Sequence, residues 1–240
     1  MSALFIVPTP VGNLEDITLR ALRVLAEADM VLAEDTRKTS VLFNKYAIHT
    51  PLVSHHKFNE HHTVNAIVKR ITTGCRVALV SDAGTPGISD PGFLLVRTCI
   101  ANNIEVECLP GATAFVPALI NSGLPCDRFC FEGFLPLKNG RITRIKQLQD
   151  EKRTMVFYEA PVRLIKTLTQ LAEVFGNNRR ACIARELTKI HEENNRGTLA
   201  DLITHYSMNA PKGEIVIIVA GNTPPKKSPT LQSVLDDSAY

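Results

Sequence analysis

The stretch VALVSDAGTPGISDPGFLLV, residues 77–96, combines the features that decide the fold of this chain. Its first four residues form a continuous apolar run, which is typical of a strand buried on both faces of a parallel sheet. A loop rich in Gly, Pro and Asp follows at once and contains no basic residue. Asp90 as N-cap, with Pro91 at the first helical position, predicts that a helix begins there. Strand, loop and helix in this order predict an α/β fold.

The same order recurs on both sides of this stretch. We predict strands in ALFIVPTP, MVLAED and IEVECLP, and helices over 18–28 and 36–45, in TVNAIVKRITTG and in TAFVPALINSG. Strands that alternate with helices predict a mostly parallel sheet covered on both faces.

A second series begins after SGLPCD. It has predicted strands in FCFEGF, TMVFYE, RACIAREL and GEIVIIVAG, and predicted helices over 141–149, in PVRLIKTLTQLAEVFG and in TLADLITHY; TKIHEENNRG is predicted to be irregular. We therefore expect two α/β domains, residues 1–118 and 119–222, followed by a flexible tail over 223–240 that is rich in Pro and polar residues. A cleft between two domains is a common place for a ligand.

The composition argues against several classes of protein. The formal net charge is only +3 and no apolar run is long enough to cross a bilayer, so we expect a cytoplasmic globular protein. The six cysteines are scattered, form no C-x-x-C pair and are interpreted as reduced core residues.

Four loops follow predicted strands of the first domain: PTPVGNLED, AEDTRKTS, SDAGTPGISDPG and LPGATA. Ligands of parallel sheets bind beyond the carboxyl ends of the strands. Glycine lets the backbone approach a ligand closely, and proline fixes the shape of a loop. Simple turn formation explains each loop alone, but four together predict a preformed pocket.

The chemistry of these loops restricts the ligand. No phosphate-binding Gly-rich motif follows any strand, and the acids near Asp82 would repel a phosphate. Acids in such a pocket suit a cationic or hydroxyl-rich ligand, such as one with a ribose and a sulfonium or amine.

Seven blocks, in order from about Phe5 to about Gly221, resemble signature blocks of the ribosomal RNA small-subunit methyltransferase I family: PTPVGNLEDIT, EDTRKTSVL, SDAGTPGISDPG, PGATA, SGLP with FEGFLP, FYEAPVR, and ARELTKIHE with RG. That family belongs to the tetrapyrrole-methylase-like (class III) S-adenosylmethionine methyltransferases. The resemblance implies two α/β domains with S-adenosylmethionine in the cleft between them, and a homodimer. It also implies 2′-O-methylation of a cytidine in the decoding region of 16S ribosomal RNA, either free or within the 30S subunit.

The resemblance also implies which residues contact the methyl donor. Residues near its amino-acid, ribose and adenine parts would be Pro10, Asp82, Ala83, Gly84, Thr85, Ala112, Thr113, Tyr158 and Ala184. Lys57 and Phe58 stand where the family tends to have an acid and a histidine, whereas Asn59 and Glu60 agree with it.

Methyl transfer needs an aligned acceptor and a group that takes its proton. In EDTRKTS we expect Asp35 to be the base, Glu34 to orient it and Arg37 to hold a phosphate. Helix capping by Glu34 or Asp35 is an equally good explanation of an isolated acid. Asn59 and Glu60 are expected to help receive the nucleotide. The nearby histidines show no recognisable metal-ligand spacing, so a metal site is not expected.

The RNA hypothesis predicts a basic rim beside the cleft, formed by Lys138, Arg141, Arg144 and Lys146, although a solvated helix face also explains this run. A small-molecule methyltransferase acting on a tetrapyrrole or corrin would instead have a deep apolar cavity. A noncatalytic RNA-binding protein would keep the rim and lack the donor pocket.

Overall fold

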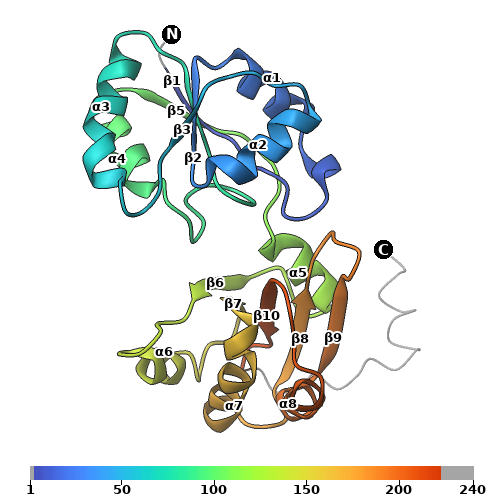
Figure 1. Ribbon diagram of the computed structural model, residues 1–240. Helices are drawn as coiled ribbons and strands as arrows, with labels where there is room; N and C mark the ends of the chain where they lie inside the picture. Colours follow the sequence, from blue (N-terminus) through green and yellow to red (C-terminus); the bar gives the residue numbers. More distant parts are fainter. Residues whose placement is uncertain (1–2, 223–240) are drawn as a thin grey trace, which may run out of the picture.

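The structure, a computed structural model, describes residues 3–222, and the expected tail over 223–240 lies outside them (Figure 1). The described part forms two units, each built on a five-stranded sheet. The prediction of a two-sheet α/β fold is confirmed. No helix among the described residues has the length and apolar character to cross a bilayer.

The first sheet is wholly parallel and has the order β3-β2-β4-β1-β5. Its strands are β1 (Ala3–Ile6), β2 (Met30–Ala33), β3 (Leu52–Ser54), β4 (Val77–Val80) and β5 (Glu105–Cys108). Alternate residues of β1 face opposite cores, with Phe5 on one side and Leu4 and Ile6 on the other. The apolar run is continuous because both faces of the strand are covered.

Two helices cover each face of this sheet. On one face lie α1 (Leu19–Glu27) and α2 (Thr36–Lys45), and on the other lie α3 (Glu60–Thr72) and α4 (Phe93–Ala101). A short 3-10 helix, η1 (Leu14–Asp16), precedes α1. The predicted bounds of α2 are confirmed at both ends. The predicted start of α4 is wrong, because its N-cap is Gly92 at φ 137° and not Asp90.

The second sheet is mixed and has the order β6-β7-β10-β8-β9. Its strands are β6 (Phe129–Phe134), β7 (Thr154–Glu159), β8 (Arg180–Arg185), β9 (Glu193–Thr198) and β10 (Ile215–Val219). Only β6 and β7 pair in parallel, and β10 is antiparallel to both of its neighbours. The segment TKIHEENNRG, predicted to be irregular, contributes most of the edge strand β9, which pairs with β8 along its whole length.

One face of the second sheet packs against α6 (Arg141–Gln147), α7 (Leu164–Phe175) and α8 (Leu199–Met208). A second 3-10 helix, η2 (Pro161–Arg163), leads into α7. The other face is covered by α5 (Phe115–Ser122), which contributes Ala118 and Leu119 to the core of the second unit. The expected boundary between residues 118 and 119 falls within this helix.

The six cysteines differ in how deeply they are buried. Cys99 and Cys182 are buried, but Cys108 and Cys126 are exposed, so the prediction that all six are core residues is wrong. Cys108 ends β5, an edge strand of the first sheet, where no further strand covers it.

Candidate functional site

A cavity of about 430 Å³ lies between the two units. The first unit contributes the ends of β1, β2 and β4 and the segment before α5, and the second contributes β6, the β7–η2 turn and the start of β10. Its lining includes Val11, Glu34, Lys38, Asp82, Ala83, Gly84, Thr85, Ile88, Ser89, Asp90, Thr113, Ala114, Phe134, Tyr158, Glu159, Ala160, Pro161, Leu187, Gly213, Glu214, Ile215 and Val216. The cavity therefore opens at the carboxyl ends of the parallel strands.

The loop after β4 is fixed by hydrogen bonds to the loops beside it. Thr9 Oγ1 donates to the Ser81 carbonyl over 3.1 Å, and Thr9 and Gly84 exchange two backbone hydrogen bonds. Thr85 Oγ1 donates to the Ala112 carbonyl over 3.0 Å. The loops after β1, β4 and β5 thus form one connected wall, with its backbone positioned before any ligand binds.

Three carboxylates of the first unit line the cavity, namely those of Glu34, Asp82 and Asp90. Asp82 accepts hydrogen bonds from the Asp35 N–H (3.0 Å) and from Lys38 Nζ (2.6 Å). Burial, with the Asp82 charge adding to it, raises the pKa of Glu34. Burial, followed by the charge of Glu34, raises the pKa of Asp90 to about 6. Three acids with a single nearby ammonium favour a cationic ligand.

Asp35 lies at the N-terminus of α2 as its N-cap. Its Oδ1 accepts from the Arg37 backbone N–H and from Arg37 Nε, and its Oδ2 accepts from Arg37 Nη2. These hydrogen bonds lower the pKa of Asp35 to about 2. Asp35 is not among the lining residues of the cavity, so the capping explanation is the one that this geometry fits.

Asn59 and Glu60 lie at the start of α3 and are not among the residues that line the cavity. The Asn59 side chain is engaged locally, because its Oδ1 accepts from the His56 N–H and its Nδ2 donates to the Ser54 carbonyl. The structure does not bring these two residues together with Glu34 and Asp82 in one pocket wall.

The residues expected to contact the donor fall into three groups. The four residues from Asp82 to Thr85, together with Thr113 and Tyr158, line the cavity. Ala184 is buried and pairs with Val216, which does line it, while Ala112 accepts the hydrogen bond of Thr85. Pro10 instead lines a separate cavity of about 240 Å³, which shares only Lys38 and Asp82 with the larger one.

Glu159 anchors the wall contributed by the second unit. It is 3% exposed and its carboxylate accepts from Arg163 Nε (2.7 Å), Thr167 Oγ1 (2.6 Å), Arg141 Nη2 (3.1 Å) and the Ala160 N–H (2.8 Å). Burial raises the pKa of Glu159, but these hydrogen bonds outweigh burial and leave the pKa below its ordinary value. The network holds the turn of Tyr158 to Pro161 against the cavity.

The predicted basic rim is wrong at Arg141, which is buried, while Arg144 is paired but its side chain remains 44% exposed. Arg141 is only 5% exposed, because it lies one helical turn before Ile145 on the buried face of α6. Arg144 makes a bidentate pair with Glu132. Lys138 and Lys146 are exposed.

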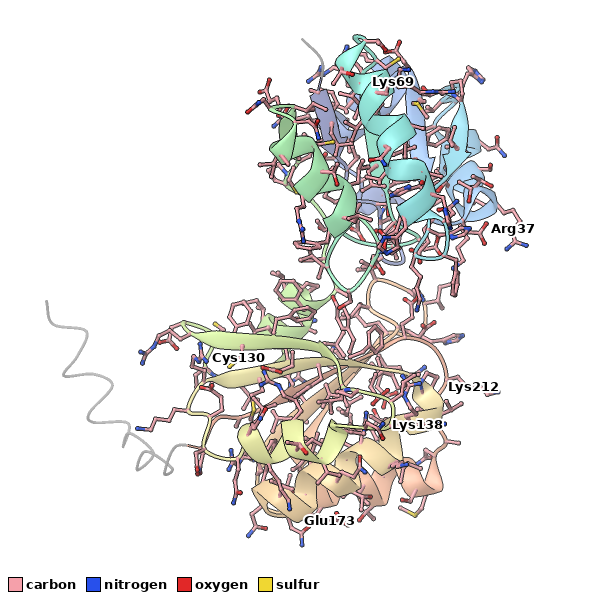
Figure 2. The ribbon with its side chains drawn as sticks, turned by 90° about the vertical axis from the view of Figure 1, so that its left-hand side faces the viewer. Arg37, Lys69, Cys130, Lys138, Glu173 and Lys212 are labelled. Atoms are coloured by element: carbon pink, nitrogen blue, oxygen red, sulfur yellow. The ribbon has the colours of Figure 1, made fainter. Side chains whose placement is uncertain are left out.

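Other basic side chains border the cavity. Figure 2 shows Arg37 projecting from the first unit and Lys212 on the same side of the second. Each is adjacent in sequence to a lining residue, Lys38 and Gly213 respectively.

The two units also touch at one end of the cavity. The Asn13 N–H donates to Thr188 Oγ1 over 2.9 Å, and a Cβ on Gly12 would lie 2.6 Å from the Leu187 carbonyl oxygen. Glu186 and Thr188 adopt positive φ values of 51° and 62°, which are unfavourable for residues with a side chain. The motif ARELTK therefore forms a strained contact between units, and Lys189 pairs there with Glu186 and Glu214.

Asp90, Glu159 and Lys38 also line the cavity, although no sequence pattern assigns them to a site. The Asp-Pro pair at Asp90 is a helix-start signal and therefore predicts capping. The structure shows that Gly92, and not Asp90, is the N-cap of α4. Glu159 follows an apolar strand and carries no signal that distinguishes it from a surface acid.

Comparisons with known proteins identify the relatives of this chain. Residues 3–203 match the family model described as Tetrapyrrole (Corrin/Porphyrin) Methylases. The chain is 49% identical to a protein of Synechocystis named ribosomal RNA small subunit methyltransferase I, over 93% of this chain and 81% of that protein. It is 47% identical to the protein of the same name from Thermotoga maritima, over 92% of this chain and 99% of that one. A crystal structure of diphthine synthase shares the fold, with a TM-score of 0.74 at 14% identity over 93% of this chain and 92% of that one.

Proposed function

The chain belongs to the tetrapyrrole (corrin/porphyrin) methylase family, and from that premise we propose that it uses S-adenosylmethionine to methylate small-subunit ribosomal RNA. The acceptor atom in this proposal is the 2′-oxygen of a cytidine in the decoding region of 16S RNA. The observation that carries the proposal is the cavity between the units, lined by acids and by apolar side chains of both units. The relatives that share almost half of its residues are named for this class of RNA substrate.

The residues of the cavity fit the methyl donor. A volume of about 430 Å³ is within the range of sites for ligands of this size. The donor carries a sulfonium, an ammonium and ribose hydroxyls but no phosphate, which matches a wall of three carboxylates with no Gly-rich phosphate loop. Asp82 to Thr85 and Thr113 would hold its amino-acid and ribose parts, and Tyr158 would pack on its adenine.

When bound there, S-adenosylmethionine supplies a methyl carbon that is open to attack from the side opposite its sulfur. The protein's own contribution is to align the acceptor oxygen, exclude water and accept a proton. The backbone wall formed by the loops after β1, β4 and β5 is positioned in advance by its internal hydrogen bonds.

Incubation with methyl-labelled donor and separate acceptors tests the proposal. The acceptors are free small-subunit RNA, assembled 30S subunits and a tetrapyrrole, and the labelled RNA is digested to nucleosides. We expect label on the ribose of a cytidine in one of the two RNA samples. Label on a base would contradict the 2′-O assignment, and label on the tetrapyrrole alone would favour the small-molecule alternative. No donor binding by calorimetry would contradict an enzyme and favour a noncatalytic RNA-binding protein.

A further inference from the structure

We propose that a second cavity, beside the donor cavity, binds the base of the cytidine that is methylated, and that Glu132 and Arg144 select cytosine there. The inference rests on the proposed function. This base cavity has a volume of about 380 Å³ and lies between α6 and the end of β6, the edge strand of the second sheet (Figure 1). Its polar lining side chains are those of Glu132, Thr143, Arg144 and Gln147.

Phe134 connects the base cavity to the donor cavity, because it is the one described residue that lines both. Its side chain is 52% exposed, and its ring meets the Tyr158 ring edge to face with the centroids 5.6 Å apart. The 2′-oxygen and the base of a nucleoside are carried by adjacent ribose carbons. When the oxygen faces the methyl carbon in the donor cavity, the base therefore lies in an adjoining space. The Phe134 ring offers that base a face for stacking.

A β-bulge places Glu132 in the wall of the base cavity. The pairing of β6 with β7 shifts between Phe131 and Gly133, so Glu132 is the extra residue of the bulge, and Gly133 has φ 59°. Bulges re-aim side chains and are frequent beside active sites. The Glu132 side chain is only 10% exposed. Its carboxylate is thus positioned by the backbone of the sheet and not by a flexible loop.

Glu132 and Arg144 retain capacity for a ligand. Arg144 Nε donates to Glu132 Oε2 over 2.8 Å, and its Nη2 donates to Oε1 over 2.9 Å. A carboxylate has about four acceptor sites and a guanidinium has five N–H donors, so the pair does not exhaust either group. Among residues 3–222, Arg144 Nη1 donates only to Gln147 Oε1, over 3.4 Å. The wall therefore presents an acceptor next to donors.

This arrangement distinguishes cytosine from uracil. Cytosine has an N4 amino donor beside its N3 acceptor, whereas uracil has an O4 acceptor beside its N3–H donor. A glutamate accepts from cytosine N4, which is a recurring contact in base recognition. In the proposed arrangement the N4 amino group donates to Glu132 and the guanidinium of Arg144 donates to N3 or O2. Uracil would place O4 against the Glu132 carboxylate, with two acceptors opposed.

The base cavity is joined to the donor cavity by a buried guanidinium. Arg141 Nη1 donates to the Pro136 carbonyl over 3.2 Å, and Pro136 lines the base cavity. Arg141 Nη2 donates to Glu159, which lines the donor cavity. One side chain thus fixes a lining segment of each cavity. The relative position of base and methyl donor is then set by the fold before RNA binds.

The exposed Lys138 and Lys146 stand two residues after Pro136 and Arg144, which line the base cavity, and Lys138 is labelled in Figure 2. Lysines can contact phosphates, which position an RNA strand without reading its sequence. The Glu132–Arg144 pair would supply the sequence reading that these lysines lack.

The cavity of about 240 Å³ is the competing place for the base, since it shares Lys38 and Asp82 with the donor cavity. It has no aromatic lining residue on which a base could stack. Its carboxylate, Asp82, accepts from Lys38 and from the Asp35 N–H. Val41 lines this cavity and is 60% exposed, so Val41→Ala alters it with little effect on the core.

Glu132→Gln tests the proposal in the full-length protein, with RNA or reconstituted 30S subunits that carry C or U at the methylated position. An amide presents either a donor or an acceptor, so it accepts both bases. We expect kcat/KM for the C substrate, and with it the ratio of C to U, to fall about 10- to 100-fold. The donor dissociation constant, measured by calorimetry, should change less than about threefold, because Glu132 does not line the donor cavity.

The matched control is Glu173→Gln, an exposed glutamate on α7 of the same unit, which should leave the C-to-U ratio unchanged. An unfolded fraction of enzyme lowers both rates by the same factor. The ratio therefore reports base selection and not folding.

A second readout needs no turnover. Filter binding without the donor should show tighter binding of the C substrate than of the U substrate by the wild type, and equal binding by Glu132→Gln. Phe134→Leu should weaken both about tenfold and alike, because stacking does not depend on the edge of the base.

The outcomes separate this inference from the proposed function. A wild type that binds the donor but methylates no RNA would overturn the proposed function. A wild type that methylates RNA, with a Glu132→Gln variant that keeps the C-to-U ratio, would overturn only the role of Glu132. A changed preference at a neighbouring nucleotide instead would overturn the assignment of the cavity to the methylated base. Loss of the ratio in Val41→Ala alone would place that base in the 240 Å³ cavity.

Discussion

Two carboxylates of the same cavity illustrate how burial and partners decide ionisation. Burial and neighbouring acids raise the pKa of Asp90, whereas four hydrogen bonds lower the pKa of the more deeply buried Glu159. Groups whose pKa values are pushed apart within one site are candidates for different roles. We infer that Glu159 is a fixed structural anion.

Glu159→Gln tests the structural role of this anion. The change leaves the Arg141 guanidinium buried without its counter-charge, so we expect the free energy of unfolding at pH 7 to fall by about 3–5 kcal/mol. Because the folded pKa of Glu159 is lowered, the stabilisation exists above its unfolded value of 4.5 and is lost as the pH falls through the folded pKa. Denaturant unfolding at pH 7 and pH 3 should therefore give a smaller difference between variant and wild type at pH 3.

The exposed Glu173→Gln on α7, which Figure 2 shows at the outer end of the second unit, is the matched control. It should change the free energy of unfolding by less than about 0.5 kcal/mol. An equal effect of both substitutions would mean that the Glu159 network contributes nothing specific to stability.

Helices and strands with a clear pattern of apolar residues could be predicted from the sequence, whereas the polar strand β9 could not. The helix α2 and the five-residue apolar run of β10 are where the sequence analysis expected them. The strand β9 was missed because ENNRGT has no alternation, and its position depends only on pairing with β8. The loops that line the cavity were identifiable because they follow buried strands. The burial of Arg141 and the exposure of Asp90 to the cavity depend on tertiary structure, which no local sequence pattern indicates.

The contact between the PVGN turn and the ARELTK motif should control the cavity width. A Cβ in Gly12→Ala would lie 2.6 Å from both the Leu187 carbonyl oxygen and Thr188 Oγ1, and 2.7 Å from Lys189 Cγ. Relieving this overlap requires the two units to separate, at a cost of about 1–3 kcal/mol. We expect donor affinity to fall roughly tenfold, as measured by calorimetry.

The thermal unfolding of Gly12→Ala serves as its control, since neither core is altered. A single cooperative transition, with a melting temperature lowered by no more than the roughly 2–12 °C that this cost implies, together with the loss of affinity, would locate the effect at the contact between units. Wild-type affinity in this variant would show that the contact has no influence on the donor cavity.

At the scale of the whole molecule, the basic surface differs in part from the one that the sequence predicted, because Arg141 is buried. Arg141 is buried in its pair with Glu159, whereas Arg37 and Lys212 are exposed and lie beside residues that line the cavity. The RNA would then span both units across the mouth of the cavity. The homodimer implied by the resemblance stays a prediction, which molar mass in solution would test.

Lys212→Ala tests this RNA path. We expect weaker binding to all RNA sequences, with the slope of log affinity against log salt reduced by about 1, because one phosphate contact is lost. The control is Lys69→Ala, an equally exposed lysine that Figure 2 shows on the first unit at the end remote from the second. Filter binding across a salt series checks both, and equal losses in the two variants would indicate only a general effect of net charge.

The position of β10 has a consequence for the order in which the molecule is made. It is the last described strand in the chain and the central strand of the second sheet, between β7 and β8. The first sheet has all of its strands once residue 108 has been synthesised, but the second must wait for residues 215–219. Until then β7 and β8 have unpaired edges that can pair with other chains. A nascent chain stalled shortly before Ile215 should therefore carry a folded first unit and an aggregation-prone second one.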